Sequence, residues 1–421
     1  MGEKNQFRNN FIWNILGTGV NAFNSLFFLI TVTRINGAEK AGIFSIAFST
    51  ACIFFVIGIY AGRIYQVTEP DKNISNKDYI VNRIITVIIM NIVVVLFCVF
   101  RKYEFYKTLI FILLTFYKSI EAFCEVIYGV LQKNEKLEVV GKSLFIKSFI
   151  SVMCFVLIDF FTKNMILSII SIIVIWLLML FIYDFRKSSS YINYSRMVNW
   201  NNVLKIFRLG FTTFAITFLG LYIINAPKYA IDTYLQSNLQ TVFGIVVMPA
   251  TILSLVAQFL IHPYLNEILK SYKENDLKRL KKMLLKLVLS LISVGIVSSI
   301  LAYLFGVQIL GLIYGIDLVP YRTGLIMIIV AATLYTIGII YSSVLTTVRE
   351  TFSQFIIYMV ISVFALVISN IFTKVFNLNG AFWAYLATMT LYFVLYTIYT
   401  NVKLNKIFSK KKNNELPIIS S

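Results

Sequence analysis

Charged residues are scarce in this sequence. Only 14% of its 421 residues are charged, and 59% are hydrophobic, whereas soluble domains average about 25% charged and about 45–50% apolar. A water-soluble fold of this composition would expose large apolar surfaces. A lipid bilayer accepts such surfaces, provided that the backbone polar groups pair within helices or a closed barrel. The composition therefore excludes an ordinary soluble domain.

Residues that bind metals or form disulfides are also few. The single histidine, His262, excludes a metal site built from histidines alone. Four cysteines lie within apolar runs without CxxC spacing, so we interpret them as small buried hydrophobic residues; they are Cys52, Cys98, Cys124 and Cys154. There is no Walker loop, and no long outer loop carries paired carboxylates or a nucleophile with its base. We predict a protein that is not an enzyme and that needs no cofactor or metal.

Long apolar runs predict an all-α polytopic membrane protein. The runs are continuous, as in 84–100 and 165–183, and lack the alternation of barrel strands. A spanning helix needs about 20 apolar residues. Twelve such spans are expected, near 11–33, 41–62, 80–100, 105–130, 143–161, 165–185, 206–231, 239–262, 283–308, 320–347, 352–374 and 379–402. Because the first run has no signal-peptide cleavage site before the second, we predict it to be the first span.

A polar stretch divides the spans into two sets of six. We predict an N-terminal six-helix bundle over 1–190, a cytoplasmic linker over 191–205, a C-terminal six-helix bundle over 206–402 and a basic cytoplasmic tail over 403–421. Residues 13–34 align without a gap on 207–228, which pairs Arg34 with Lys228. Parallel repeats occur in transporters, whose substrate binds where the halves meet. The pattern predicts two bundles around a central cavity.

The distribution of Lys and Arg predicts the orientation. Of the 38 Lys and Arg residues, 28 fall on the side that holds both termini, 8 fall on the other side, and Lys118 and Lys228 lie within spans. The 28 include Lys147, which we assign to the connection before the fifth span. Positive residues favour the cytoplasmic side, so we predict a multi-pass protein of the cell membrane with both termini cytoplasmic. The formal charge of +19 then faces anionic lipid headgroups rather than nucleic acid.

Charged residues inside spans are costly, at roughly 2.5–3.5 kcal/mol each, and the fourth span carries three. Lys118, Glu121 and Glu125 follow one another at i, i+3 and i+7, and therefore share one helix face. They could line a cavity, with Glu121 or Glu125 taking up a proton for coupling. Alternatively, Lys118 and Glu121 neutralise each other as a structural pair, and Glu125 lies near the cytoplasmic end.

The seventh span ends in NAPKYAID, where Pro227 is expected to break or bend the helix. Lys228 and Asp232 lie beside it at i and i+4, next to Asn225. This group could present a basic residue to an anionic headgroup. The alternative is a charge at the helix end whose side chain reaches the outer interface.

Polar residues in two other spans are further candidates. The first span carries Asn21 and Asn24, followed by Arg34; the amides could bind a sugar or join neighbouring helices. In the eighth span, His262 follows Gln258 at i+4 and could bind substrate or a proton, although a lone histidine is more often structural. We include these residues among the candidates for substrate binding or coupling.

Two stretches resemble a known family. WNILGTGVNAFNSLFFLITVTRINGAEKAGIFSIAF is similar to the opening of the bacterial polysaccharide flippases. NAPKYAIDTYLQSNLQTVFGIVVMP, followed by AQFLIHPYL, resembles their seventh and eighth helices. These flippases form the oligosaccharide-lipid branch of the multidrug/oligosaccharidyl-lipid/polysaccharide exporter superfamily. The resemblance covers about a sixth of the chain.

The resemblance implies two six-helix bundles around a cavity that binds undecaprenyl-diphosphate-linked oligosaccharide. This lipid would be moved to the outer leaflet by alternating access, for assembly of capsule, O-antigen or teichoic-acid-type polymers, alongside other membrane proteins of polysaccharide assembly. Basic cavity residues of the family match Arg34 and Lys228. Many relatives have arginine where Lys228 stands, and lysine keeps the charge but loses bidentate phosphate geometry. A proton gradient, a sodium gradient and mass action all remain open as driving forces.

Other functions for the same spans make different predictions. A multidrug exporter on this fold should have more carboxylates than bases in its cavity. A membrane polysaccharide polymerase should have a long outer loop with catalytic Arg, His or Glu, whereas the outer loops here are short. A scaffold without transport activity is the third alternative.

Overall fold

The computed structural model describes residues 3–60, 62–68, 73–193, 196–261 and 264–414. These residues contain helices and no β-strand, which agrees with the predicted all-α class. The chain divides into two compact units, Met1–Leu221 (unit 1) and Tyr222–Ser421 (unit 2). We describe each unit by itself.

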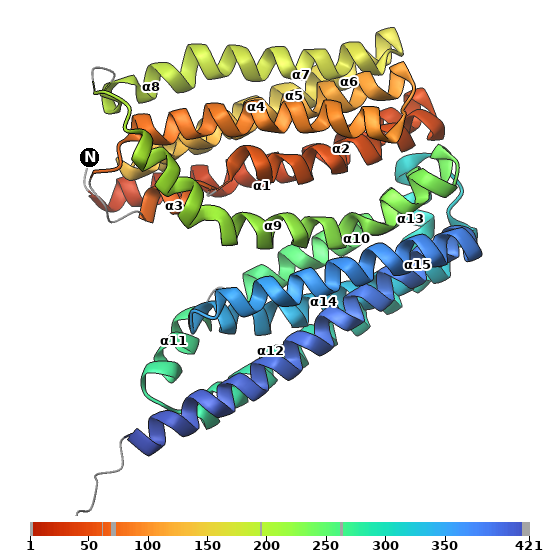
Figure 1. Ribbon diagram of the computed structural model, residues 1–421. Helices are drawn as coiled ribbons and strands as arrows, with labels where there is room; N and C mark the ends of the chain where they lie inside the picture. The colour runs from red at the N-terminus through yellow and green to blue at the C-terminus, as the bar shows by residue number, and fades with distance from the viewer. Residues whose placement is uncertain (1–2, 61, 69–72, 194–195, 262–263, 415–421) are drawn as a thin grey trace, which may run out of the picture. The chain divides into compact units, whose positions relative to one another are not determined.

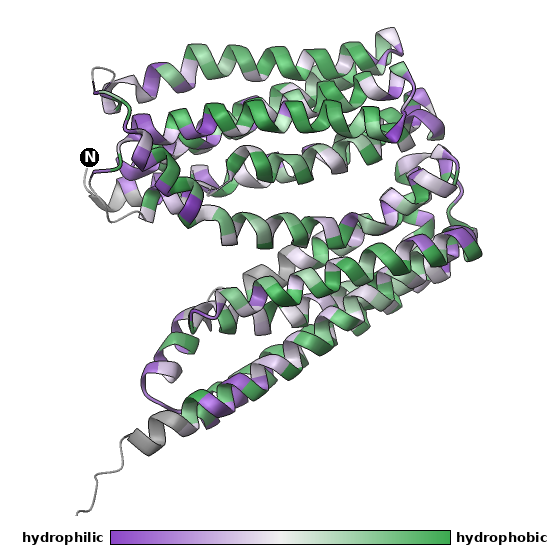
Figure 2. Cartoon of the chain, viewed as in Figure 1, coloured by the Kyte–Doolittle hydropathy of each residue, from purple (hydrophilic) through white to green (hydrophobic). Residues whose placement is uncertain are grey.

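Unit 1 contains six long helices, coloured red to yellow-green in Figure 1. Its elements are α1 (Glu3–Asn36), α2 (Ala38–Ile59), α3 (Gly62–Thr68), α4 (Asn76–Arg101), α5 (Phe105–Lys133), α6 (Leu137–Thr162), α7 (Met165–Met179), the π-helix η1 (Leu180–Phe185), α8 (Arg186–Ser188) and the 3₁₀ turn η2 (Ser189–Tyr191). Helix α5 lies at the centre and packs against α2, α3, α4 and α7. Hydrophobic residues run along these helices, and hydrophilic ones concentrate near their ends (Figure 2).

Two glycines let α1 and α6 approach closely. A Cβ on Gly17 would meet the carbonyl oxygen of Gly141, and a Cβ on Gly141 would meet the backbone of Trp13. Small residues allow such backbone contact in membrane bundles, where van der Waals packing rather than the hydrophobic effect holds helices together. The α1–α6 pair is therefore a fixed part of unit 1.

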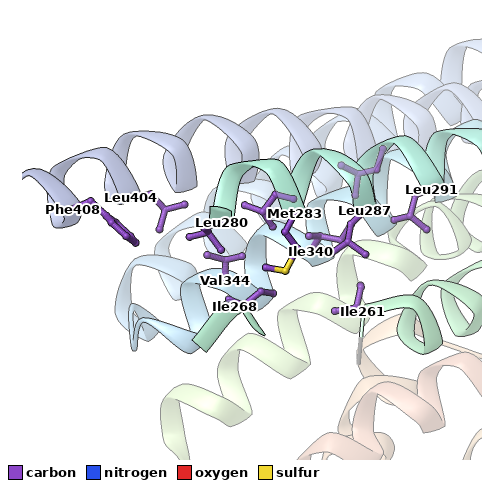
Figure 3. Close-up of a cluster of buried hydrophobic side chains, with 12 residues drawn as sticks. Ile261, Ile268, Leu280, Met283, Leu287, Leu291, Ile340, Val344, Leu404 and Phe408 are labelled. Atoms are coloured by element: carbon purple, nitrogen blue, oxygen red, sulfur yellow. The ribbon is translucent and has the colours of Figure 1, made fainter. Parts of the chain in front are cut away.

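Unit 2 is also built from helices in its described part. Its elements are α9 (Trp200–Tyr234), which begins in unit 1, α10 (Ser237–Ile261), α11 (Leu265–Lys273), α12 (Leu277–Leu301), the π-helix η4 (Ala302–Gly306), α13 (Val307–Tyr314), the 3₁₀ turn η5 (Val319–Tyr321), α14 (Arg322–Thr347) and α15 (Thr351–Asn414). A cluster of aliphatic side chains and one phenylalanine joins α11 to α12, α14 and the end of α15 (Figure 3); it includes Ile268, Leu280, Met283, Leu287, Ile340, Val344, Leu404 and Phe408.

The boundary between the units falls inside α9 because its first part is held by unit 1. The Asp78 carboxylate accepts hydrogen bonds from the backbone N–H of Asn199 (3.0 Å) and from the Asn202 amide (2.9 Å). The Tyr60 ring stacks on Phe214, with 4.8 Å between centroids. Thus the linker predicted over 191–205 is partly helical, and α9 begins at Trp200 rather than near 206.

Ten helices in the described part of the chain are long and apolar enough to cross a membrane. One of them covers 59 residues, Thr351–Ser409, and a straight helix of that length would measure about 90 Å, three times the hydrocarbon thickness. Non-helical backbone at Phe376 and Asn377 divides it into two spans. Helix α5 has 29 residues and falls outside the ten because of its charges. With these two additions the fold agrees with twelve spans.

Candidate functional site

The structure pairs two of the three charges predicted on α5. The Lys118 ammonium lies 2.6 Å from Glu121 Oε2, and the two side chains are 13% and 11% exposed. The i, i+3 spacing therefore produces the self-neutralising pair that the sequence allowed as one of two interpretations. Because both side chains keep some exposure, the pair can be reached from one face of unit 1.

Helices α1 and α6 hold the carboxylate of this pair in place. The Asn21 amide on α1 donates to Glu121 Oε1 (3.3 Å), and the Ser148 hydroxyl on α6 donates to Asn21 Oδ1 (3.1 Å). Asn24, one turn along, is buried with 3% exposure. Glu121 is thus bound through both oxygens, one by a movable ammonium and the other by an amide that is itself anchored.

Aromatic rings surround the ammonium of Lys118. Its Nζ lies 5.1 Å from the Phe48 ring centroid, 5.6 Å from that of Phe55 and 5.4 Å from that of Tyr117. Ring faces attract a cation within about 6 Å. The rings therefore position the Lys118 ammonium without using its hydrogen-bond donors, of which an ammonium has three.

The third predicted charge, Glu125, belongs to a neighbouring pair. Arg63 Nε on α3 lies 3.7 Å from Glu125 Oε2, with side-chain exposures of 22% and 25%. Arg83 on α4 is 4% exposed, donates to the carbonyl oxygen of Gly58 and interacts electrostatically with Glu125. Arg63 and Arg83 therefore form a basic cluster near this glutamate.

A fully buried ion pair lies deeper in unit 1, and the sequence analysis missed it. The Lys147 ammonium on α6 contacts Asp184 Oδ2 in η1, and both side chains are 0% exposed. Lys147 also donates to the Tyr128 hydroxyl (3.0 Å), and the Ser143 hydroxyl donates to the other oxygen of Asp184 (2.6 Å). Each charge is thus satisfied by several partners, as a buried pair requires.

The π-helix explains how Asp184 reaches this position. Four buried residues of this segment are spaced by four; they are Trp176, Leu180, Asp184 and Ser188. In a regular helix of 3.6 residues per turn, residues at this spacing would move gradually from one face to another. The wider π turn over Leu180–Phe185 absorbs the extra residue and keeps all four on one face. Single π turns of this kind are frequent at functional sites.

Our assignment of Lys147 to a loop was therefore wrong. Lys147 stands ten residues inside α6, and its charge is neutralised within the bundle instead of marking the cytoplasmic side. The available signal was the row Ser143, Lys147 and Ser151, which repeats every four residues and indicates a polar stripe on a helix. The charge count alone could not separate this stripe from a loop.

The candidates in unit 2 lie together on the second part of α9. Asn225, Lys228 and Asp232 are all half-buried, and their spacing of three and four puts them on one face. Pro227 is buried inside α9, which continues to Tyr234. The predicted break at this proline is therefore wrong.

Arg34 is not brought to the Lys118 pair. Arg34 is exposed near the end of α1, 13 residues beyond Asn21 and therefore about 20 Å farther along the helix axis. His262 lies outside the described residues. Within the described ranges, no group of three or more His, Cys, Asp or Glu side chains could hold a metal ion.

The sequence is similar to that of a known protein. No family model matches the sequence. The capsular polysaccharide biosynthesis protein CapF of Staphylococcus aureus is 24% identical over 315 residues, which cover 73% of this chain and 77% of that protein.

Solved structures match over nearly the whole chain. The inward-facing conformation of a multidrug resistance MATE family transporter of the MOP superfamily has a TM-score of 0.65 at 13% identity, with 94% of this chain and 98% of that chain covered. The Vibrio cholerae MATE transporter VcmN in its bent form has a TM-score of 0.61 at 10% identity, with coverages of 96% and 97%. These matches agree with the fold that the resemblance implied. The chain has the fold of the MATE transporters of the MOP superfamily.

Proposed function

We propose that the protein is a flippase that moves an undecaprenyl-diphosphate-linked oligosaccharide from the cytoplasmic to the outer leaflet by alternating access. The observation that carries the proposal is the match of 73% of the chain to a capsular polysaccharide biosynthesis protein, on a chain with a transporter fold. Capsule assembly needs a lipid-linked, anionic intermediate to cross the membrane. A cationic site in a spanning helix lowers the cost of bringing a diphosphate into the bilayer.

Lys118 is the residue that we assign to the diphosphate. Glu121 Oε2 lies 2.6 Å from its ammonium. An arriving diphosphate replaces this carboxylate, while Asn21 keeps its hydrogen bond to the other oxygen. The aromatic rings around the ammonium hold it in place during the exchange.

The displaced Glu121 then offers a route for coupling. Substrate binding at Lys118 would separate this carboxylate from its ammonium partner, and release of the substrate would restore the pair. Glu125 stays paired with Arg63 and is the less favoured coupling residue.

The test neutralises Lys118 and Lys228 together. We expect Lys118→Gln with Lys228→Gln to lower flipping of a fluorescent lipid-linked oligosaccharide in proteoliposomes by more than about tenfold, because removing a desolvated charge contact to an anion costs roughly 2–5 kcal/mol. The matched control replaces two exposed lysines, one in each unit, Lys163 and Lys374, and should retain normal flipping. Normal flipping by the Lys118/Lys228 variant in correctly folded protein would contradict the assignment.

A multidrug exporter is the second candidate, favoured by the fold that the chain shares with a multidrug resistance MATE family transporter and by the rings around Lys118. Lys118→Gln distinguishes the two functions, because it should change their transport rates in opposite directions. A lysine repels cationic drugs, so Lys118→Gln should raise drug efflux by an exporter, whereas it should lower flipping of an anionic lipid. Measuring ethidium efflux and lipid flipping in one vesicle preparation decides between them.

A further inference from the structure

The second part of α9 has two unlike faces within unit 2. One face packs inward through Ile223, Ala226, Ala230 and Ile231, which are at most 2% exposed. The other face is half-exposed and carries aromatic, amide and charged side chains; these are Tyr222, Asn225, Lys228, Tyr229 and Asp232. We call these five residues the α9 strip.

Two tyrosines frame the strip. The rings of Tyr222 and Tyr229 lie nearly parallel, with 6.1 Å between centroids and 22° between planes. They are seven residues apart, so they stand two turns apart on the same side, with Asn225 between them. Their arrangement places flat aromatic surfaces beside hydrogen-bonding groups.

Hydrocarbon is an unsuitable neighbour for this strip. Ionisable residues within spans face the bundle interior or a water-filled cavity. The faces of unit 2 that suit lipid look different, as in α12, where Leu285, Leu289 and Ile296 are 59%, 54% and 56% exposed. The α9 strip thus belongs on a hydrated surface.

We infer that the α9 strip binds the carbohydrate of the lipid-linked oligosaccharide, and that Tyr222 and Tyr229 determine the preference for a glycan-bearing lipid. This inference rests on the proposed flippase function. Tyrosine offers a rigid ring for the apolar face of a sugar and a polar end for its hydroxyls, and Asn225 and Asp232 can bind further hydroxyls. The strip measures about 15 Å along the helix, which is longer than a single phosphate group requires.

Recognition of sugar and recognition of charge can be separated. A basic side chain that binds the diphosphate treats bare and glycan-bearing lipid diphosphates alike. Tyr222 and Tyr229 bind sugar, so they contribute only when a glycan is attached. Polar groups that fix orientation within a largely preformed site are the usual source of such specificity.

The experiment measures binding of two lipids to the full-length purified protein in nanodiscs: undecaprenyl diphosphate carrying an oligosaccharide, and undecaprenyl diphosphate alone. For Tyr222→Leu with Tyr229→Leu, we expect affinity for the glycan-bearing lipid to fall about tenfold, equivalent to about 1.4 kcal/mol. Affinity for the bare lipid should stay within about twofold. Tyr222→Phe with Tyr229→Phe keeps the rings and should lose much less.

Tyr303→Leu is the matched control. Tyr303 is 54% exposed in η4 beside the exposed side chains of Leu301 and Leu304, and its replacement should leave both affinities unchanged. An equal loss for both lipids in the α9 variant, or no loss for either, would overturn the glycan subsite while leaving the flippase proposal standing. Failure of the wild-type protein to bind either lipid would overturn both.

Discussion

The interiors of the two units are built from different chemistry. Unit 1 buries several charged side chains, namely Asp78, Arg83, Glu121, Lys147, Asp159 and Asp184. Among the described residues of unit 2, the buried polar side chains are uncharged. Buried charge is costly in a membrane. The described part of the chain therefore concentrates this cost in unit 1.

The interior of unit 2 contains a cluster of tyrosines instead of charged side chains. The Tyr392 ring lies 4.8 Å from that of Tyr335, 5.7 Å from that of Tyr358 and 4.6 Å from that of Tyr396, measured between centroids. The hydroxyls of Tyr358 and Tyr392 are 3.0 Å apart and share a hydrogen bond. This core, contributed by α14 and both spans of α15, depends on shape and ring contact.

The contrast predicts different sensitivities. Unit 1 should fail when one member of an ion pair is removed, because the other member is left buried and uncompensated. Unit 2 should respond mainly to changes of volume and ring geometry.

Breaking the Lys147–Asp184 pair should have the largest effect. Lys147→Met leaves Asp184 charged at 0% exposure, and removing one partner of a buried pair costs roughly 3–5 kcal/mol. We expect a large fall in the unfolding midpoint of the purified protein in detergent, measured by intrinsic fluorescence.

The double variant Lys147→Met with Asp184→Leu is the control. Replacing both charges with apolar residues of similar size is often neutral, so this variant should recover at least half of the lost stability. A double variant as unstable as Lys147→Met would show that volume at this position, rather than uncompensated charge, limits the stability of unit 1.

The corresponding test in unit 2 adds a methyl group next to the tyrosine cluster. A Cβ on Gly338 in α14 would lie 2.5 Å from Cδ1 of Tyr392, and overpacking of this kind costs about 1–3 kcal/mol. We expect Gly338→Ala to lower the unfolding midpoint. Gly19→Ala in α1 is the control, because a Cβ there has no heavy atom within 4 Å; it should stabilise slightly, since alanine favours helix over glycine. Equal effects of the two substitutions would contradict the tyrosine core.

Hydropathy predicted the spans well because lipid imposes length and apolarity on every spanning helix. The Lys118–Glu121 pair was also visible, since helix geometry alone brings i and i+3 together. Contacts between distant segments were not visible. Arg63 meets Glu125 only because α3 packs against α5.

The buried pair of Lys147 and Asp184 was hidden for a further reason. Its two residues stand 37 positions apart, and the π turn that aims Asp184 inward has no recognisable pattern in a single sequence. In addition, a charge count treats Lys147 as a loop residue, because the count ignores that the lysine lies ten residues inside α6. Topology rules consider only the sign of a side chain's charge. The position of that side chain in the fold also depends on which residues neutralise it.

Removing a single hydroxyl from each core makes the smallest and most direct comparison. Tyr358→Phe loses a neutral hydrogen bond to Tyr392, worth about 0.5–1.5 kcal/mol. Tyr128→Phe loses a bond from the Lys147 ammonium (3.0 Å) and a neutral bond shared with Ser143 (3.2 Å), and bonds to charged groups are worth about 1.5–3 kcal/mol. Both tyrosines are buried and both substitutions keep the ring, so the variants differ in the charged partner and in the second bond of Tyr128. Their unfolding midpoints in the same detergent should therefore fall further for Tyr128→Phe than for Tyr358→Phe, and the reverse order would mean that unit 1 is not held together by its buried charges.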